Sequence, residues 1–217
     1  GVIVMVYFLN IKDTLSAQSK KIVYSVLKLK DANRLVSEVR FAHGIFGGFI
    51  TGKLLDSLII GIMCFFAMQF MGMPYVLLIS VIIGVTNVIP FFGPFIGAVP
   101  SAFLILMISP MKCLYFLIFI LVLQQFDGNI LGPKILGDST GLPSFWVLFS
   151  ILLFGGLLGF VGMIIGVPAF AVIYRLVSAY VSNNLKKKDL SPRTEDYMEL
   201  DHINEEDKIY IGRDGAE

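Results

Sequence analysis

Charged side chains are rare in most of this sequence, and three of them fall in one short stretch. Between residues 54 and 174 only five residues carry a formal charge, and Asp127, Lys134 and Asp138 lie together in a Gly/Pro-rich interruption. A charge at the centre of a bilayer costs about 2.5–3.5 kcal/mol or more unless it is paired or lines a wet cavity. A carboxylate kept there can carry a proton or a cation, so this stretch is the first place to expect function.

A second unusual stretch, residues 86–100, combines helix breakers with an amide. It contains three prolines and two glycines, and it includes Asn87, Pro90, Gly93 and Pro94. Each proline removes a backbone donor and interferes with the preceding helical turn. Carbonyls freed at membrane depth need water, ions or side chains as partners, and the Asn87 amide is one such partner.

The polar stretch 124–143 permits two interpretations. It is either an aqueous loop or a re-entrant element that lines a cavity, and its apolar residues favour the second. Together the two stretches supply the candidate residues of a substrate or ion path: Asn87, Pro90, Gly93, Pro94, Gln124, Asp127, Asn129, Pro133, Lys134 and Asp138.

Glycines recur along residues 155–166. Small residues allow membrane helices to approach closely, so this surface is predicted to pack helices. No Lys-Ser/Thr pair follows, as a phosphate-binding loop would require. The predicted packing glycines are Gly155, Gly156, Gly159, Gly162 and Gly166.

Composition predicts the elements that must position these residues. Hydrophobic residues make up 56% of the chain and charged residues 15%, against roughly 25% charged in soluble domains. We expect an all-α, polytopic membrane protein with broken or re-entrant helices. The expected apolar segments are 54–71, 75–91, 94–109, 111–126, 144–158 and 159–181, which form either six crossings or four crossings with two re-entrant hairpins.

The charge pattern divides the chain into four parts. Residues 1–9 are predicted to end a truncated transmembrane helix, 10–53 to form a basic amphipathic helix on the membrane surface, and 54–181 to form the transport core. Residues 182–217 form a charged tail that is expected to be disordered. Lysines and arginines on 10–53 and at the start of the tail predict that both are cytoplasmic.

Enzyme motifs are missing from the sequence. There is no Walker A motif, HExxH, CxxC or Ser/His/Asp constellation, and no motif of an intramembrane aspartyl enzyme accompanies Asp56 and Asp127. Cys64 and Cys113 lie in apolar runs and are interpreted as core residues. We expect no enzymatic activity, no cofactor and no metal site, and the net charge of +1 does not suggest a nucleic-acid partner.

Four motifs occur in order along the chain: Gly52-Lys-Leu-Leu55, Asn87-x-Ile-Pro90-Phe-Phe-Gly93-Pro94, Asn129-Ile-Leu-Gly-Pro133-Lys-Ile-Leu-Gly137, and Gly141-Leu-Pro143 followed by Gly155-Gly156 and Val167-Pro168. These motifs resemble those of the autoinducer-2 exporter, or PerM-like, family of bacterial membrane proteins. The resemblance implies a multispan protein of the bacterial cytoplasmic membrane that forms homo-oligomers. It also implies either export of the quorum-sensing signal autoinducer-2 or sodium(lithium)/proton antiport.

The resulting hypothesis is a secondary transporter that exports a small polar solute in exchange with an ion gradient. Asp127 would carry the proton or cation, and Asn87, Gln124 and Asn129 would line the path. A sodium(lithium)/proton antiporter is the first alternative. A channel-like pore and a non-transporting membrane scaffold are the others.

Overall fold

The computed structural model describes residues 1–136, 141–204 and 208–212, with the backbone alone described at residues 2–6, 9 and 136. The chain divides into two compact units, Gly1–Ala169 and Phe170–Glu217. Each unit is described by itself below.

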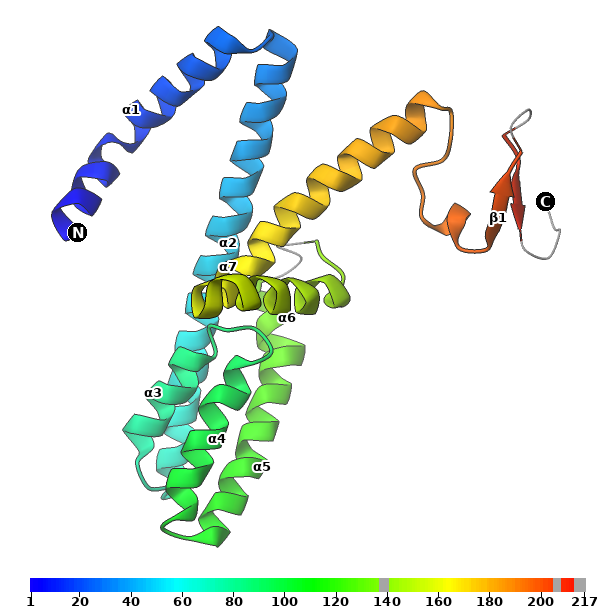
Figure 1. Cartoon of the computed structure of the whole chain (residues 1–217). Coiled ribbons are helices and arrows are strands. Elements are labelled where there is room, and N and C mark those ends of the chain that lie inside the picture. The colour runs from blue at the N-terminus through cyan, green and yellow to red at the C-terminus, as the bar shows by residue number, and fades with distance from the viewer. Residues whose placement is uncertain (137–140, 205–207, 213–217) are drawn as a thin grey trace. The chain divides into compact units, whose positions relative to one another are not determined.

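Helices dominate the described residues, as Figure 1 shows. The helices are α1 (Val2–Val26), α2 (Leu29–Phe70), α3 (Val76–Thr86), α4 (Gly93–Leu106), α5 (Pro110–Phe126), the π-helix η1 (Asp127–Leu131), α6 (Gly132–Leu136), α7 (Ser144–Lys187) and the short 3₁₀ helix η2 (Glu195–Tyr197). Two short strands, β1 (Leu200–Ile203) and β2 (Tyr210–Gly212), follow. The predicted all-α fold of a polytopic membrane protein is confirmed.

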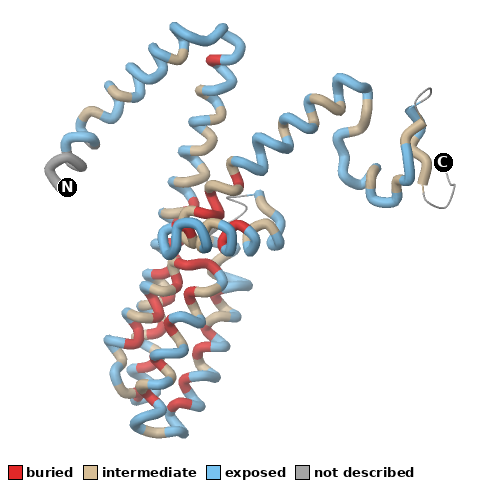
Figure 2. The backbone as a smooth tube through the Cα atoms, viewed as in Figure 1, coloured by how far each residue is buried: buried red, intermediate tan, exposed pale blue. Residues whose placement is uncertain are grey.

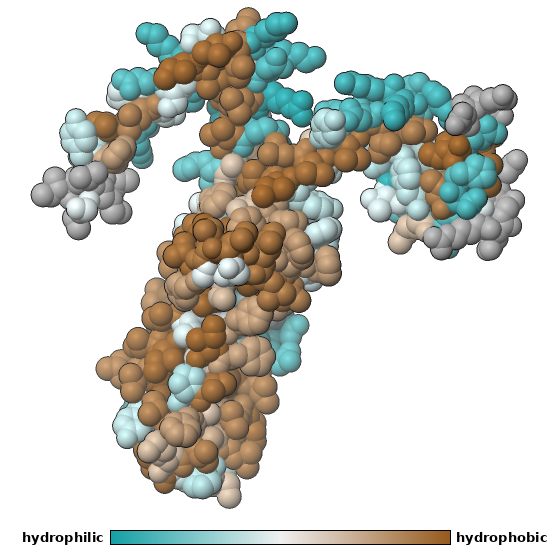
Figure 3. Space-filling model, in the orientation of Figure 1, coloured by the Kyte–Doolittle hydropathy of each residue, from teal (hydrophilic) through white to brown (hydrophobic). Residues whose placement is uncertain are grey.

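Three helices in the described part of the chain are long and apolar enough to cross a bilayer. They cover Leu29–Phe70, Pro110–Ile135 and Ser144–Lys187, and α3 and α4 are shorter apolar helices. Apolar side chains cover much of the outside of α2–α5 in Figure 3, and the Phe70 side chain is 91% exposed. A helix that is apolar on all sides is suited to lipid rather than to water.

The beginning of the chain differs from the expected segments. One helix, α1, continues through the expected boundary at residue 9 to Val26, and α2 continues through the expected boundary at residue 53 to Phe70. The break between them is at Leu27 and Lys28, which both have extended backbone dihedrals. No Gly or Pro marks this break in the sequence, so local propensity could not predict it.

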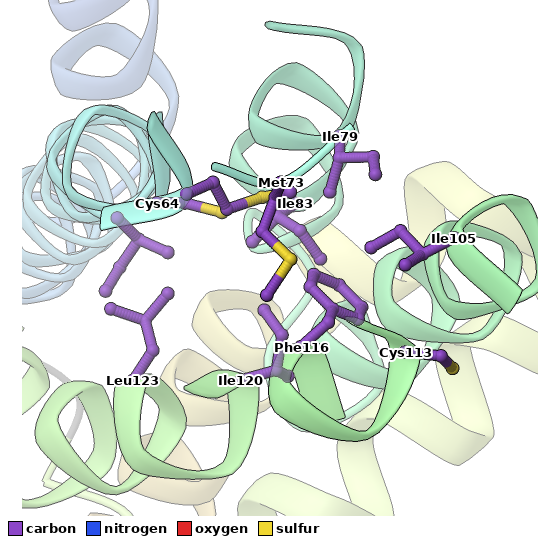
Figure 4. Close-up of a cluster of buried hydrophobic side chains, with 11 residues drawn as sticks. Cys64, Met73, Ile79, Ile83, Ile105, Cys113, Phe116, Ile120 and Leu123 are labelled. Carbon is purple, nitrogen blue, oxygen red and sulfur yellow. The ribbon is translucent and has the colours of Figure 1, made fainter. Parts of the chain in front are cut away.

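The hydrophobic core of the first unit lies between α2, α3, α4 and α5. Its buried residues are concentrated there (Figure 2), and their side chains point toward one another in Figure 4. Gly61 of α2 and Gly84 of α3 let two backbones meet, because a Cβ atom on Gly84 would lie 3.1 Å from the Gly61 Cα atom. This contact fixes how α2 and α3 lie along each other.

The predicted interruption at 86–100 is shorter than expected. The helical conformation stops at Thr86 and resumes at Gly93, while Pro100 lies inside α4. The turn is tight, since a Cβ atom on Gly93 would overlap the Thr86 carbonyl oxygen and Phe91 has a φ of +63°. Pro94 lies in the first turn of α4, where its missing N–H costs no helical hydrogen bond.

The sequence after α5 remains helical instead of forming an open loop. The helix widens into the π-helix η1 at Asp127 and then continues as α6 through Leu136. A π-turn adds one residue to a helical turn, and such turns occur frequently at functional sites. Up to Leu136, the chain therefore changes from α-helix to π-helix and back to α-helix where a Gly/Pro-rich interruption was expected.

The helix α7 reverses direction at Gly159, where the backbone has φ +62° and ψ −141°. The segments before and after it fold against each other: a Cβ atom on Gly162 would overlap the Phe154 carbonyl oxygen, and one on Gly166 would lie 2.9 Å from the Ser150 carbonyl oxygen. The two expected apolar segments, 144–158 and 159–181, thus meet at Gly159. Its positive φ suits glycine, which has no Cβ atom to clash.

The second unit contains more order than the expected disordered tail. β1 and β2 pair in antiparallel fashion, and the Ser191 backbone N–H donates to the Tyr210 hydroxyl at 2.7 Å. The Tyr197 hydroxyl donates to the Ser191 carbonyl oxygen at 2.7 Å, and the Tyr197 and Tyr210 rings pack edge to face at 5.5 Å. Two aromatic side chains provide the apolar contact that composition alone did not predict.

Candidate functional site

Four polar side chains from three segments meet inside the first unit. Lys53 and Asp56 come from α2, Asn87 directly follows α3, and Asp127 begins the π-helix η1. All four are buried, and Asp56 and Asn87 are 0% and 1% exposed. We call these four residues the polar cluster.

One amide joins the two carboxylates of the polar cluster. The Lys53 Nζ atom donates to Asp56 Oδ2 at 2.8 Å, an ion pair between residues three apart on the same helix. Asn87 Nδ2 donates to Asp56 Oδ2 and also to Asp127 Oδ2, each at 3.2 Å. A side-chain amide nitrogen has two hydrogens, so the Asn87 amide uses both to bridge carboxylates from different helices.

The other oxygen of each carboxylate has no hydrogen-bond partner among the described residues. These atoms, Asp56 Oδ1 and Asp127 Oδ1, are buried from solvent. A buried polar atom without a partner costs about 1–3 kcal/mol, and more if it is charged. The two oxygens are therefore positioned to accept a proton, a cation or a water molecule.

The formal charges of the polar cluster do not balance. Asp56 and Asp127 contribute two negative charges when both are ionised, and Lys53 contributes one positive charge. Uncompensated charge is strongly unfavourable in a low-dielectric interior. One additional proton or monovalent cation would neutralise the cluster.

Three local features bring the cluster together. The Gly61–Gly84 contact holds α2 against α3. A Cβ atom on Gly84 would also lie 3.3 Å from the carbonyl oxygen of Ser57, the residue next to Asp56. Helix α3 ends at Thr86, which places the Asn87 amide at the start of the tight turn. The π-helix η1 begins at Asp127, where the carboxylate accepts a hydrogen bond from Asn87.

The structure brings together only some of the residues that the sequence analysis selected. Asn87 and Asp127 share a hydrogen bond. Gln124 lies one turn before Asp127, and its buried Nε2 atom has no partner among the described residues. Asn129 is exposed and donates instead to the backbone and side chain of Gln125.

The remaining candidates contribute in other ways or lie apart. Pro90 and Gly93 are buried in the turn after α3, and Pro94 is half-buried at the start of α4. These three shape the backbone next to Asn87. Pro133 and Lys134 are exposed on α6. Asp138 lies outside the described residues.

The sequence analysis did not assign Lys53 and Asp56 to the site. Lys53 was included in the basic segment 10–53, and Asp56 was considered only together with Asp127, as an acid of an intramembrane enzyme. A signal was present, because a Lys and an Asp three residues apart on a helix can pair on one face. The missing information was that α2 continues unbroken through both residues.

A groove of about 750 Å³ lies between α2 and α3 beside the polar cluster. Its lining is apolar except for Ser57 and Ser80. The Ser80 hydroxyl donates to the Val76 carbonyl oxygen at 2.7 Å, whereas the buried Ser57 hydroxyl has no partner among the described residues. Such a lining suits lipid chains or apolar side chains better than a polar solute.

Comparison with known proteins agrees with this architecture. Residues 2–182 match the family described as "AI-2E family transporter". The chain is 44% identical over 127 residues to the "Putative transport protein YrrI" of Bacillus subtilis, covering 58% of this chain and 36% of YrrI. It is 26% identical over 142 residues to the "Putative permease PerM" of Escherichia coli, covering 64% of this chain and 40% of PerM.

A second Bacillus subtilis relative, YueF, is 35% identical over 125 residues, covering 58% of this chain and 34% of YueF. The chain thus spans about a third of the length of the curated relatives YrrI and YueF. No solved structure matches the chain. The family match covers most of the chain and all of the polar cluster, and the relatives carry the names of transporters and permeases. The chain therefore belongs to the AI-2E family of membrane transporters.

Proposed function

We propose that this chain forms part of a secondary transporter in which the polar cluster is the ion-coupling site. The cluster lacks one positive charge, and each of its carboxylates has a buried oxygen without a partner among the described residues. A proton or monovalent cation that binds there would supply the missing positive charge and a partner for a buried carboxylate oxygen. The exported species would be a small polar solute, with autoinducer-2 as the first to test because of the family.

Each residue of the cluster has a distinct role in this proposal. Asp127 accepts the ion, because no cationic side chain pairs with it among the described residues. Asp56 pairs with Lys53 at 2.8 Å, so it already has a cationic partner. Asn87 couples ion binding at one carboxylate to the other carboxylate, since its amide nitrogen donates to both. The turn after α3 and the π-helix η1 provide backbone that can rearrange as the ion enters and leaves.

Sodium(lithium)/proton antiport is the second candidate function. Two carboxylates and an amide supply hard oxygen atoms, which alkali and alkaline-earth cations prefer as ligands. In this case the ion that binds the cluster is itself the cargo. The same charge deficit supports this candidate, because a proton and a monovalent cation would compete for one position.

Other expectations from the sequence remain proposals about the whole protein. We propose that it resides in the bacterial cytoplasmic membrane as a homo-oligomer. Residues 10–53 and the tail from residue 182 would face the cytoplasm, because lysines and arginines are concentrated in 10–53 and in 186–188. Protease protection in oriented vesicles would test this topology.

Reconstitution into liposomes tests the proposed function directly. Autoinducer-2 release and sodium/proton movement are followed in one preparation, for the wild type and for Asp127→Asn. Asp127→Asn should abolish ion-dependent movement because it removes the ionisable group while keeping the shape. Asp31→Asn is the matched control, since Asp31 is exposed in the first turn of α2 and lies far along that helix from Asp56.

The outcomes separate the four functional classes. Autoinducer-2 movement that needs an ion gradient supports the exporter, and sodium/proton exchange alone supports the antiporter. Flux that does not saturate and needs no gradient would indicate a pore. Folded protein that moves neither species would favour the scaffold. Full transport by Asp127→Asn would remove the polar cluster from the mechanism.

A further inference from the structure

Lys53 places a tethered ammonium group where the polar cluster could otherwise bind a second cation. We propose that Lys53 is a specificity-determining residue, which limits the Asp56–Asp127 pair to one proton or monovalent cation and excludes divalent cations. The inference rests on the proposed function, because it assigns the charge selectivity of the same site. It concerns binding, so it can be tested without measuring transport.

The geometry makes Lys53 a tethered cation. Its Nζ atom lies 2.8 Å from Asp56 Oδ2, and the two side chains are 10% and 0% exposed. Both residues lie on one face of α2, three positions apart, so the helix itself holds the ammonium beside the carboxylate. Asp56 Oδ2 also accepts from Asn87, whereas Asp56 Oδ1 and Asp127 Oδ1 have no partner among the described residues and can receive an incoming ion.

Charge balance then predicts which ion fits. With Lys53 present, one positive charge neutralises the cluster, and a divalent cation would leave an excess positive charge in a buried site. Without Lys53, two carboxylates joined by an amide have a charge of −2. That charge and those oxygen ligands match a hard divalent cation. Lys53 thus decides between one and two positive charges at the same oxygens.

A purely structural ion pair would behave differently. Breaking a buried pair destabilises a protein whatever its function, because an unpaired charge remains. Loss of stability alone therefore does not test the proposal. A gain of divalent binding in a Lys53 variant is the distinguishing readout, because weaker packing cannot create it.

Equilibrium Mn²⁺ binding to the purified full chain in detergent, followed by the EPR signal of free Mn²⁺, provides the test. Lys53→Met should bind Mn²⁺ about tenfold or more tightly than the wild type, because one repulsive charge at close range is removed. Adding Asp127→Asn to Lys53→Met should abolish the gain. Lys53→Arg keeps the charge and should bind Mn²⁺ as the wild type does. Lys30→Met, an exposed lysine on the same helix, is the matched control.

Two results would overturn the inference. One is a folded Lys53→Met that binds Mn²⁺ no more tightly than the wild type, or a Lys53→Arg that gains binding as Lys53→Met does. The other needs no Lys53 variant: if Asp127→Asn weakens Mn²⁺ binding of the otherwise wild-type chain, divalent cations already enter the cluster. This second measurement keeps the proposal testable if Lys53→Met does not fold.

The result is also separable from the proposed function. A Mn²⁺ site gained in Lys53→Met, with no ion-dependent transport by the wild type, would support the role of Lys53 and contradict ion coupling. Transport that Asp127→Asn abolishes, with no gain in Lys53→Met, would support coupling and contradict the role of Lys53.

Discussion

Asn87 donates a hydrogen bond to Asp127 across 40 positions of sequence, from an amide nitrogen 3.2 Å from Asp127 Oδ2. The same nitrogen donates to Asp56 Oδ2 on a third segment of the chain. The relationship makes an uncharged residue the link between two buried carboxylates. It also identifies the contact whose loss should affect both acids at once.

Replacing Asn87 should therefore affect both ion binding and stability. Asn87→Ala leaves the buried Asp127 Oδ2 atom without its donor and removes one of the two donors to Asp56 Oδ2, at a cost of about 1–3 kcal/mol in the free energy of unfolding. We expect ion-dependent movement in liposomes to fall at least about tenfold, since 1.4 kcal/mol corresponds to one factor of ten. Asn183→Ala, at an exposed position of α7, is the control. Wild-type movement by Asn87→Ala would contradict the bridging role.

The Gly61–Gly84 contact should not tolerate a side chain. A Cβ atom on Gly84 would lie 3.1 Å from the Gly61 Cα atom and 3.3 Å from the Ser57 carbonyl oxygen, and neither backbone atom can rotate away. Gly84→Ala should destabilise the protein by about 1–3 kcal/mol, as overpacking does. Thermal unfolding in detergent measures this effect. Gly48→Ala, where nothing lies within 4 Å of the added atom, should be neutral or slightly stabilising.

Glycines at the reversal of α7 should differ in their sensitivity. Gly162→Ala would force a methyl group into the Phe154 carbonyl oxygen, whereas nothing lies within 4 Å of a methyl group on Gly156. We expect Gly162→Ala to lose about 1–3 kcal/mol and Gly156→Ala to be nearly neutral. Equal losses in the two variants, measured by thermal unfolding, would show that the reversal is not packed as described.

The second unit should depend on the Tyr210 hydroxyl. Tyr210→Phe removes the acceptor for the Ser191 N–H and should weaken this unit by about 0.5–1.5 kcal/mol. Hydrogen exchange at the Ser191 amide should become faster by the corresponding factor. Exchange in the wild type already at the rate of an unstructured peptide would support the disorder expected from composition.

The local sequence predicted which segments are helical more accurately than it predicted where each helix begins and ends. The break between α1 and α2 has no Gly or Pro, so packing must select it. Pro100 was expected to interrupt a helix and instead lies within α4. An aqueous loop was one of the two alternatives for the stretch from Asp127 to Leu136, and the stretch is instead helical through a π-turn; the re-entrant alternative stays a prediction. In each case, tertiary contacts decide between conformations that are locally similar in energy.

The sequence by itself determined that this chain is helical and surrounded by lipid, because its long apolar segments have no other favourable environment. It also identified Asn87 and Asp127, since polar groups in apolar segments are unfavourable unless they have partners. The identity of those partners was decided only by the tertiary structure. Backbone contact at Gly61 and Gly84 holds α2 against α3, which brings Asp56 and Lys53 to the same buried position and sets the charge of the cluster.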